Sequence, residues 1–184
     1  DTFSVSGFNS PDGPANLLLK NLWVENGNRT IAGQPLFIEV AAQAGLQDLA
    51  NPPLGPEPGH RAMSGGWLDY DRDGWVDLYV CHMVLNSGGD VSNRDRLYRN
   101  KGDGTFEDVT AQSGVDHGND PLTFRPCLAF VGAHLDNDLW PDIYAVNVHD
   151  PSPYHEDFFM RNNGNGTFTD MTSQSPGLGD DAGS

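Results

Sequence analysis

The sequence has little positive charge, few cysteines and no long apolar run. Its 26 Asp and Glu residues outnumber the 10 Lys and Arg residues, which gives a formal net charge of −16. This balance argues against nucleic-acid binding, because proteins of that class present a basic face to phosphate. It also argues against anionic membrane surfaces. No apolar run approaches the roughly 20 residues that cross a bilayer, so we expect no membrane insertion.

Sequence motifs of the common catalytic sites are missing as well. The chain has no Gly-x-Ser-x-Gly elbow, no His-Glu-x-x-His, no phosphate-binding loop and no Cys-x-x-Cys. We therefore expect a protein that is not an enzyme and has no catalytic residues. The only cysteines, Cys81 and Cys127, do not have the spacing of a metal site. They pair in an oxidising compartment or remain two buried thiols, and the sequence leaves both open.

The composition indicates a loop-rich all-β domain. A chain of 184 residues is long enough for one ordinary domain with a sizeable core. Glycine (22) and proline (13) are plentiful, yet apolar residues recur throughout, unlike in a disordered chain. The chain begins at Asp1 without a visible signal peptide, and we expect a processed or partial chain.

A nine-residue acidic loop is the most informative stretch. It reads Asp69-Tyr-Asp-Arg-Asp-Gly-Trp-Val-Asp77, with acids at its positions 1, 3, 5 and 9. Alternate acids on a tight turn converge on one point, and Ca²⁺ takes about six to eight oxygen ligands. Gly74 permits the left-handed turn. The alternative is an ordinary acidic surface turn. We predict a Ca²⁺ site formed by the carboxylates Asp69, Asp71, Asp73 and Asp77 and the Trp75 carbonyl.

The chain also repeats itself. Three segments resemble one another and begin at Phe37, Phe106 and Phe168. Before the last two lie Leu97-Tyr-Arg-Asn-Lys-Gly-Asp-Gly-Thr105 and Phe159-Met-Arg-Asn-Asn-Gly-Asn-Gly-Thr167, and Leu22-Trp-Val-Glu-Asn-Gly-Asn28 reads as a looser copy. The Asn-x-Gly-Asp-Gly pattern between apolar runs predicts a hairpin. With the strands flanking each acidic loop, one unit has four short antiparallel strands, as in a β-propeller blade.

A second, weaker copy of the acidic loop lies at 134–142. It has His134 at the first acid position and Leu139 at the glycine position, and it retains Asp136, Asp138 and Asp142. Loss of a carboxylate lowers Ca²⁺ affinity, and a left-handed Leu costs about 1 kcal/mol or more. We predict a second site formed by these three acids and the Trp140 carbonyl, with a turn that only resembles a site as the alternative.

These elements resemble repeats of the FG-GAP/VCBS type. The resemblance is carried by Phe130-Val-Gly-Ala133, by the loop 69–77 and by the run 97–110, and it covers residues 17–178. It implies calcium-binding β-propeller blades in secreted or cell-surface proteins. A closed propeller needs about four to eight blades, so we expect an incomplete propeller of about two blades with partial blades at the ends.

The repeat divides the chain into five parts. They are an extended N-terminal arm (1–16), a partial blade consisting of its closing hairpin (17–46), a blade with the loop 69–77 (47–115), a blade with the degenerate loop 134–142 (116–178), and a tail (179–184).

The expected function follows from these features and from the resemblance. We expect an extracellular calcium-binding protein with a structural or adhesive role, because open sheet edges invite pairing. Three outcomes remain open for the unpaired ends: the chain is a fragment of a longer protein, it closes a ring with identical copies, or it stacks head to tail into a filament. Self-association is the expected partner interaction, with glycans or cell-surface proteins as further partners. The alternatives are a polysaccharide lyase or hydrolase, or a lectin, on a propeller of which this chain is a fragment, since propellers host several functions.

Overall fold

The computed structural model describes residues 2–4, 17–22, 26–27, 30, 32–33, 35–46, 61–83, 95–115, 127–147 and 157–174. Most of the expected N-terminal arm and the tail 179–184 lie outside these residues. In the described part, the elements are β1 (Thr2–Ser4), β2 (Leu17–Asn21), β3 (Phe37–Glu39), β4 (Arg61–Leu68), β5 (Asp77–Met83), β6 (Arg96–Asn100), β7 (Phe106–Asp108), α1 (Thr110–Ser113), β8 (Cys127–Ala133), β9 (Asp142–Asn147), β10 (Phe158–Asn162), β11 (Phe168–Asp170) and a 3₁₀ turn, η3 (Thr172–Gln174).

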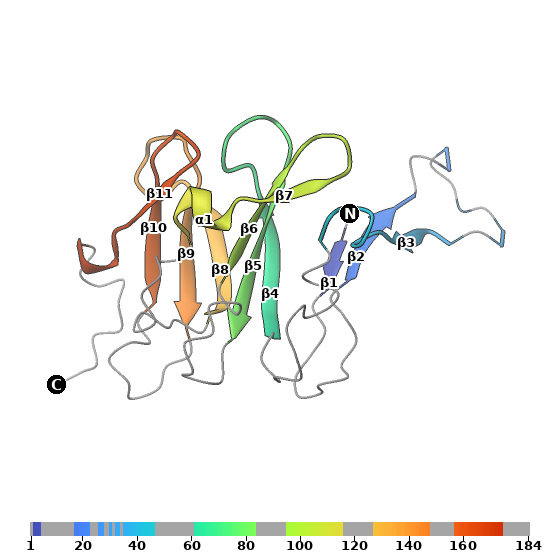
Figure 1. The fold of residues 1–184 in the computed structure, drawn as a ribbon, viewed down its shortest axis with the longest axis horizontal. Coiled ribbons are helices and arrows are strands. Elements are labelled where there is room, and N and C mark those ends of the chain that lie inside the picture. Colours follow the sequence, from blue (N-terminus) through green and yellow to red (C-terminus); the bar gives the residue numbers. More distant parts are fainter. Residues whose placement is uncertain are drawn as a thin grey trace.

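These strands form three antiparallel sheets, which confirms the prediction of an all-β fold. The first sheet has the order β1-β2-β3, the second β4-β5-β6-β7 and the third β8-β9-β10-β11. Each sheet is a meander of sequential strands, and the sheets stand side by side in chain order (Figure 1). β1 lies within the expected arm and pairs with β2 of its own chain. In the described part of the chain the sheets do not close into a ring.

The strand registers fix which residues are equivalent in the three sheets. Asn21 pairs with Phe37, Asn100 with Phe106 and Asn162 with Phe168. The counterpart of Asn100 is therefore Asn21, and the looser copy that we assigned to Leu22–Asn28 was wrong. The long connection between β2 and β3 allowed the error, because it places an Asn-Gly pair after the strand instead of at its end.

Two cores lie between neighbouring sheets. Along β5 the side chains alternate: Leu78 and Val80 join Leu18 and Leu46 in a core with the first sheet. Tyr79 and Cys81 belong instead to the core with the third sheet, which includes Ile143, Ala145 and Phe158. Both faces of the second sheet are thus buried. Its central strand is accordingly apolar at successive positions, as expected for a strand covered on both sides.

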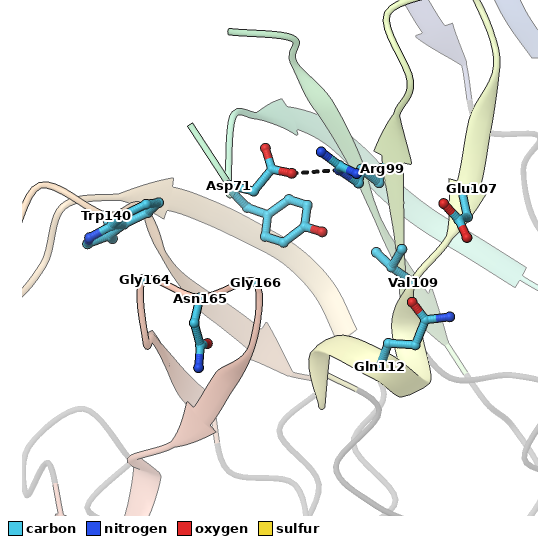
Figure 2. A pocket seen from close by; sticks show the side chains of 10 residues that line it. Asp71, Arg99, Glu107, Val109, Gln112, Trp140, Gly164, Asn165 and Gly166 are labelled. Carbon is cyan, nitrogen blue, oxygen red and sulfur yellow. Dashed lines mark hydrogen bonds and ion pairs between the residues drawn. The ribbon is translucent and has the colours of Figure 1, made fainter. Parts of the chain in front are cut away.

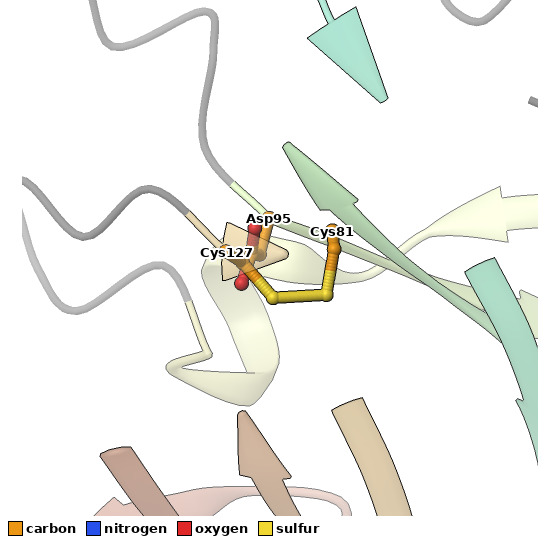
Figure 3. A group of neighbouring side chains, drawn as sticks. All are labelled: Cys81, Asp95 and Cys127. Atoms are coloured by element: carbon orange, nitrogen blue, oxygen red, sulfur yellow. A yellow bond between two sulfur atoms is a disulfide. The ribbon is translucent and has the colours of Figure 1, made fainter. Parts of the chain in front are cut away.

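A disulfide crosses the larger core. Cys81 on β5 and Cys127 on β8 are bonded, with their Cα atoms 5.1 Å apart (Figure 3). The bond decides the question that the sequence left open, and it links the second sheet to the third. Asp95 lies next to the two sulfur atoms, but both cysteines are occupied by their mutual bond.

Candidate functional site

The acidic loop joins β4 to β5 and is attached to the third strand of its sheet through Asp77. Asp77 is fully buried. One of its carboxylate oxygens accepts the Tyr70 N–H at 3.1 Å, and the other accepts the Asn100 N–H at 2.8 Å. Burial raises the pKa of Asp77 to about 7, and the two backbone hydrogen bonds act against that rise. Asp77 therefore fixes both ends of the loop.

The other acids shape the turn itself. The Asp73 N–H donates to Asp71 at 3.2 Å, the Trp75 N–H donates to Asp73 at 2.9 Å, and the Gly74 N–H donates to Asp69 at 3.2 Å. Gly74 has a φ of 90°, in the left-handed region that the sequence predicted. Each acid thus uses an oxygen to hold the backbone in a tight curve.

Arg99 on β6 reaches the outside of this loop. Its guanidinium lies 2.6 Å from Asp71 and 3.0 Å from Asp73. The hydrogen bond and the charge of Asp71 raise the pKa of Arg99 further above its ordinary value. The arginine offsets part of the repulsion between clustered carboxylates.

Three carboxylates come together on the inner side of the loop. Asp69, Asp71 and Asp77 each offer an oxygen, and these oxygens lie within 4.8 Å of one another, close enough to hold one metal ion. Asp69 Oδ1 is buried and has no hydrogen-bond partner in the described structure. A buried carboxylate oxygen without a donor is costly, so this donor set fits a hard cation such as Ca²⁺.

The second loop has the same backbone hydrogen bonds, but its acidic side chains lie farther apart. Asp142 is buried and accepts the Leu135 N–H at 2.9 Å and the Asn162 N–H at 2.8 Å, as Asp77 does in the first loop. Arg161 approaches Asp136 at 3.4 Å. Leu139 has a φ of 74° and is 64 % exposed. Among the described residues, Asp136, Asp138 and Asp142 do not form a group as close as that of the first loop.

The segment that starts with the acidic loop matches a known family. Residues 69–127 match the model of the FG-GAP-like repeat. The chain contains an FG-GAP-like repeat. This confirms the family that the sequence resembles, and such repeats are in general not catalytic in their own right. A comparison with curated proteins found no match.

Two tryptophans at matching positions of the two acidic loops, Trp75 and Trp140, each pack on a hairpin glycine. The Trp75 ring lies so close to Gly102 that a Cβ there would approach the indole nitrogen to 2.7 Å, and Trp140 covers Gly164 in the same way at 2.8 Å. The Arg72 guanidinium lies over the Trp140 ring at 5.1 Å. Both rings therefore have a packing role in their loops.

A second repeated pair was missed in the sequence. The Tyr79 hydroxyl donates to Asp95 at 2.7 Å, and the Tyr144 hydroxyl donates to Asp157 at 2.7 Å. The other oxygen of each acid accepts a backbone N–H, from His82 or Asn147, at 2.8 Å. Both acids stand just before the third strand of their sheet. An alignment of the two repeats up to Asp95 and Asp157 would have revealed the pair.

A cleft of about 430 Å³ opens between the second and third sheets beside the loop (Figure 2). Asp71, Arg99 and Glu107 line it from the second sheet, and Trp140 and Asn165 line it from the third. Charged, amide and aromatic groups thus face one open space next to the acidic loop.

No helix in the described residues has both the length and the apolar character that a membrane crossing requires.

Proposed function

We propose that this chain is a calcium-binding, propeller-type repeat module with a structural role. The convergence of Asp69, Asp71 and Asp77, with their oxygens within 4.8 Å of one another, is the observation that carries the proposal. The buried Asp69 Oδ1 supports it, because a cation would supply the partner that this oxygen lacks. Asp73 and the Trp75 carbonyl would complete a set of oxygen ligands.

Ca²⁺ would stabilise the fold because it binds side chains that already hold the loop against its sheet. Asp77 connects the loop to β6 through the Asn100 N–H, and Arg99 pairs with one oxygen of Asp71 and one oxygen of Asp73. A divalent ion among the inner oxygens removes the remaining repulsion and stabilises the folded state by mass action. The second loop would bind a second ion more weakly through Asp136, Asp138 and Asp142.

The proposed setting is an extracellular or cell-surface assembly. Millimolar extracellular Ca²⁺ suits exposed loop sites, and the Cys81–Cys127 disulfide is of the kind that persists in oxidising compartments. The two four-stranded sheets and the three-stranded sheet would be propeller blades, too few to close alone. We therefore favour a non-enzymatic adhesive or structural subunit that associates with further blades.

Isothermal titration calorimetry with CaCl₂ tests the metal. We expect saturable heat for the wild-type chain and at least a tenfold loss of affinity for Asp71→Asn, since a missing carboxylate removes more than about 1.4 kcal/mol of binding energy. Asp136→Asn makes the same change at the matched position of the second loop and leaves the tighter site intact. A flat titration of folded wild-type chain overturns the proposal.

Glycan binding is the second candidate, and the cleft in Figure 2 is the observation that favours it. Polar groups with an aromatic ring are the usual lining of small-ligand sites. Glu107 and Gln112 line the cleft and are exposed, so Glu107→Gln and Gln112→Ala leave the fold intact. Glycan-array signal that these variants abolish would support a lectin. Turnover of an acidic polysaccharide would support an enzyme instead.

A further inference from the structure

The open face of the third sheet exposes side chains whose counterparts are buried in the second sheet. Tyr70 and Leu135 occupy the same loop position, because each backbone N–H donates to the last acid of its loop. Tyr70 is 4 % exposed and its ring lies 6.0 Å from that of Phe168. Leu135 is 45 % exposed. The difference arises because Tyr70 has a following sheet to pack on, whereas the described structure has none beyond Leu135.

Two further positions on this face of the third sheet are also exposed, whereas their counterparts in the second sheet pack against the next sheet. Val146 on β9 corresponds to Cys81 on β5, which is fully buried and bonded to the third sheet. Val131 on β8 corresponds to Gly66 on β4, which lies against Phe130 of the next sheet. Val146 is 38 % exposed and Val131 is 52 % exposed. Leu135, Val131 and Val146 together form an apolar surface, which we call the trailing face.

The first sheet exposes side chains whose counterparts in the second or third sheet are buried against the preceding sheet. Phe37 and Phe168 are equivalent, because they pair with Asn21 and Asn162. Phe168 is 7 % exposed where it packs on Tyr70, but Phe37 is 41 % exposed. Leu19 corresponds to the buried Tyr98 and is only half-buried. Phe37 and Leu19 form what we call the leading face.

In the described part of the first sheet, β1 corresponds to β5 and β9, and no strand corresponds to β4 or β8. Among the described residues, the first sheet therefore has no counterpart of Phe130, the ring that lies against Gly66.

We propose that the trailing face of one copy docks on the leading face of a second copy, with Leu135 against Phe37. This contact would repeat, between two copies, the packing seen between the second and third sheets of one copy. The inference rests on the blade-type arrangement of the proposed function. The contact is heterologous, so each copy keeps one face free for the next, and the assembly grows into a ring or an open filament.

Sedimentation velocity on matched variants tests this contact. Leu135→Glu and Phe37→Glu each place a charge on one face, and both positions are exposed, so the fold, checked by circular dichroism, should persist. The wild-type chain should form species larger than the 20.0 kDa monomer, with mass rising with concentration. Each variant alone should be monomeric. Leu139→Glu adds the same charge to the same loop at a position outside the trailing face, and it should associate like the wild type.

Mixing the two variants distinguishes this contact from a symmetric one. Leu135→Glu keeps an intact leading face and Phe37→Glu keeps an intact trailing face, so an equimolar mixture should form a dimer of twice the monomer mass and nothing larger. A monomeric wild-type chain, association of either variant alone, or a mixture without dimers overturns the proposal. Repeating the sedimentation runs in Ca²⁺ and in chelator tests the proposed Ca²⁺ binding separately from the proposed contact between copies. Association without Ca²⁺ binding contradicts the proposed function alone, and Ca²⁺ binding without association contradicts this inference alone.

Discussion

The Asn162 side-chain amide donates a 2.8 Å hydrogen bond to the backbone carbonyl of Tyr70, 92 residues earlier in the chain. The same amide donates to the Pro141 carbonyl at 3.0 Å, and its oxygen accepts the Gly164 N–H at 2.9 Å. One fully buried side chain thus connects the acidic loop of the second sheet to the loop and the hairpin of the third.

Asn162→Ala should therefore destabilise the chain by about 3 kcal/mol, at about 1 kcal/mol for each of the three hydrogen bonds of its side chain. Asn100→Ala is the matched control, because Asn100 bonds to Val76 and Gly102 within its own sheet. It should cost about 1 kcal/mol less. Urea unfolding of both variants measures the difference, and equal losses would contradict a role for Asn162 between the sheets.

Removing the disulfide should cost more than removing either asparagine. Cys81 and Cys127 are separated by 46 residues, and the chain-entropy model gives about 4 kcal/mol for a closed loop of that length. Cys81→Ala with Cys127→Ala should lower the urea midpoint accordingly, and reduction of the wild-type chain should lower it by a similar amount. An unchanged midpoint under reductant would show that the bond does not stabilise the packing of these sheets.

Asp95 should make stability depend on pH. Its burial raises its pKa from 3.8 to about 7, against the opposing hydrogen bonds from His82 and Tyr79. The folded state holds the proton more tightly than the unfolded state, so the contribution of Asp95 is fully present below about pH 4 and is lost as pH rises to 7. The loss reaches about 4 kcal/mol, at about 1.4 kcal/mol per pKa unit.

Asp95→Asn has no proton to lose and should make the stability profile less steep between these pH values, while the contribution of Asp77 remains. Urea unfolding of wild type and variant across the range measures the slope. Parallel profiles for the two proteins would rule out Asp95 as its source.

Leu139→Gly should stabilise the chain by about 1 kcal/mol. Leu139 has a φ of 74°, where a side chain is strained and glycine is not. The residue is 64 % exposed, so little packing is lost. Gly74→Leu makes the reverse change at the matched position, φ 90°, and should destabilise by a similar amount. Thermal melting of both variants in chelator shows whether each change raises or lowers the melting temperature. A lower melting temperature for Leu139→Gly would contradict the claim that the backbone at Leu139 is strained.

Local patterns in this sequence predicted the strands and loops well. The hairpin strands begin at Phe37, Phe106 and Phe168, and the acidic loop runs from the end of β4 to the start of β5, as expected. Turn chemistry is local, so it can be read from neighbouring residues. The left-handed backbone at Gly74 and Leu139 followed from position alone.

Relationships between residues on different strands or different sheets were harder to predict. Whether Cys81 and Cys127 pair depends on how the second and third sheets pack, which their spacing does not encode. The assignment of the first sheet was wrong because the long connection from β2 to β3 hid the register of Asn21 with Phe37. The proximity of Arg99 to Asp71 depends on the pairing of β5 with β6.

A crystal structure of the chain grown in millimolar CaCl₂ tests the central claim most directly. The account predicts one strong density peak inside the 69–77 loop, about 2.3–2.6 Å from oxygens of Asp69, Asp71, Asp73 and Asp77 and from the Trp75 carbonyl. A loop without that peak, its inner carboxylates bonded only to protein donors, would contradict it.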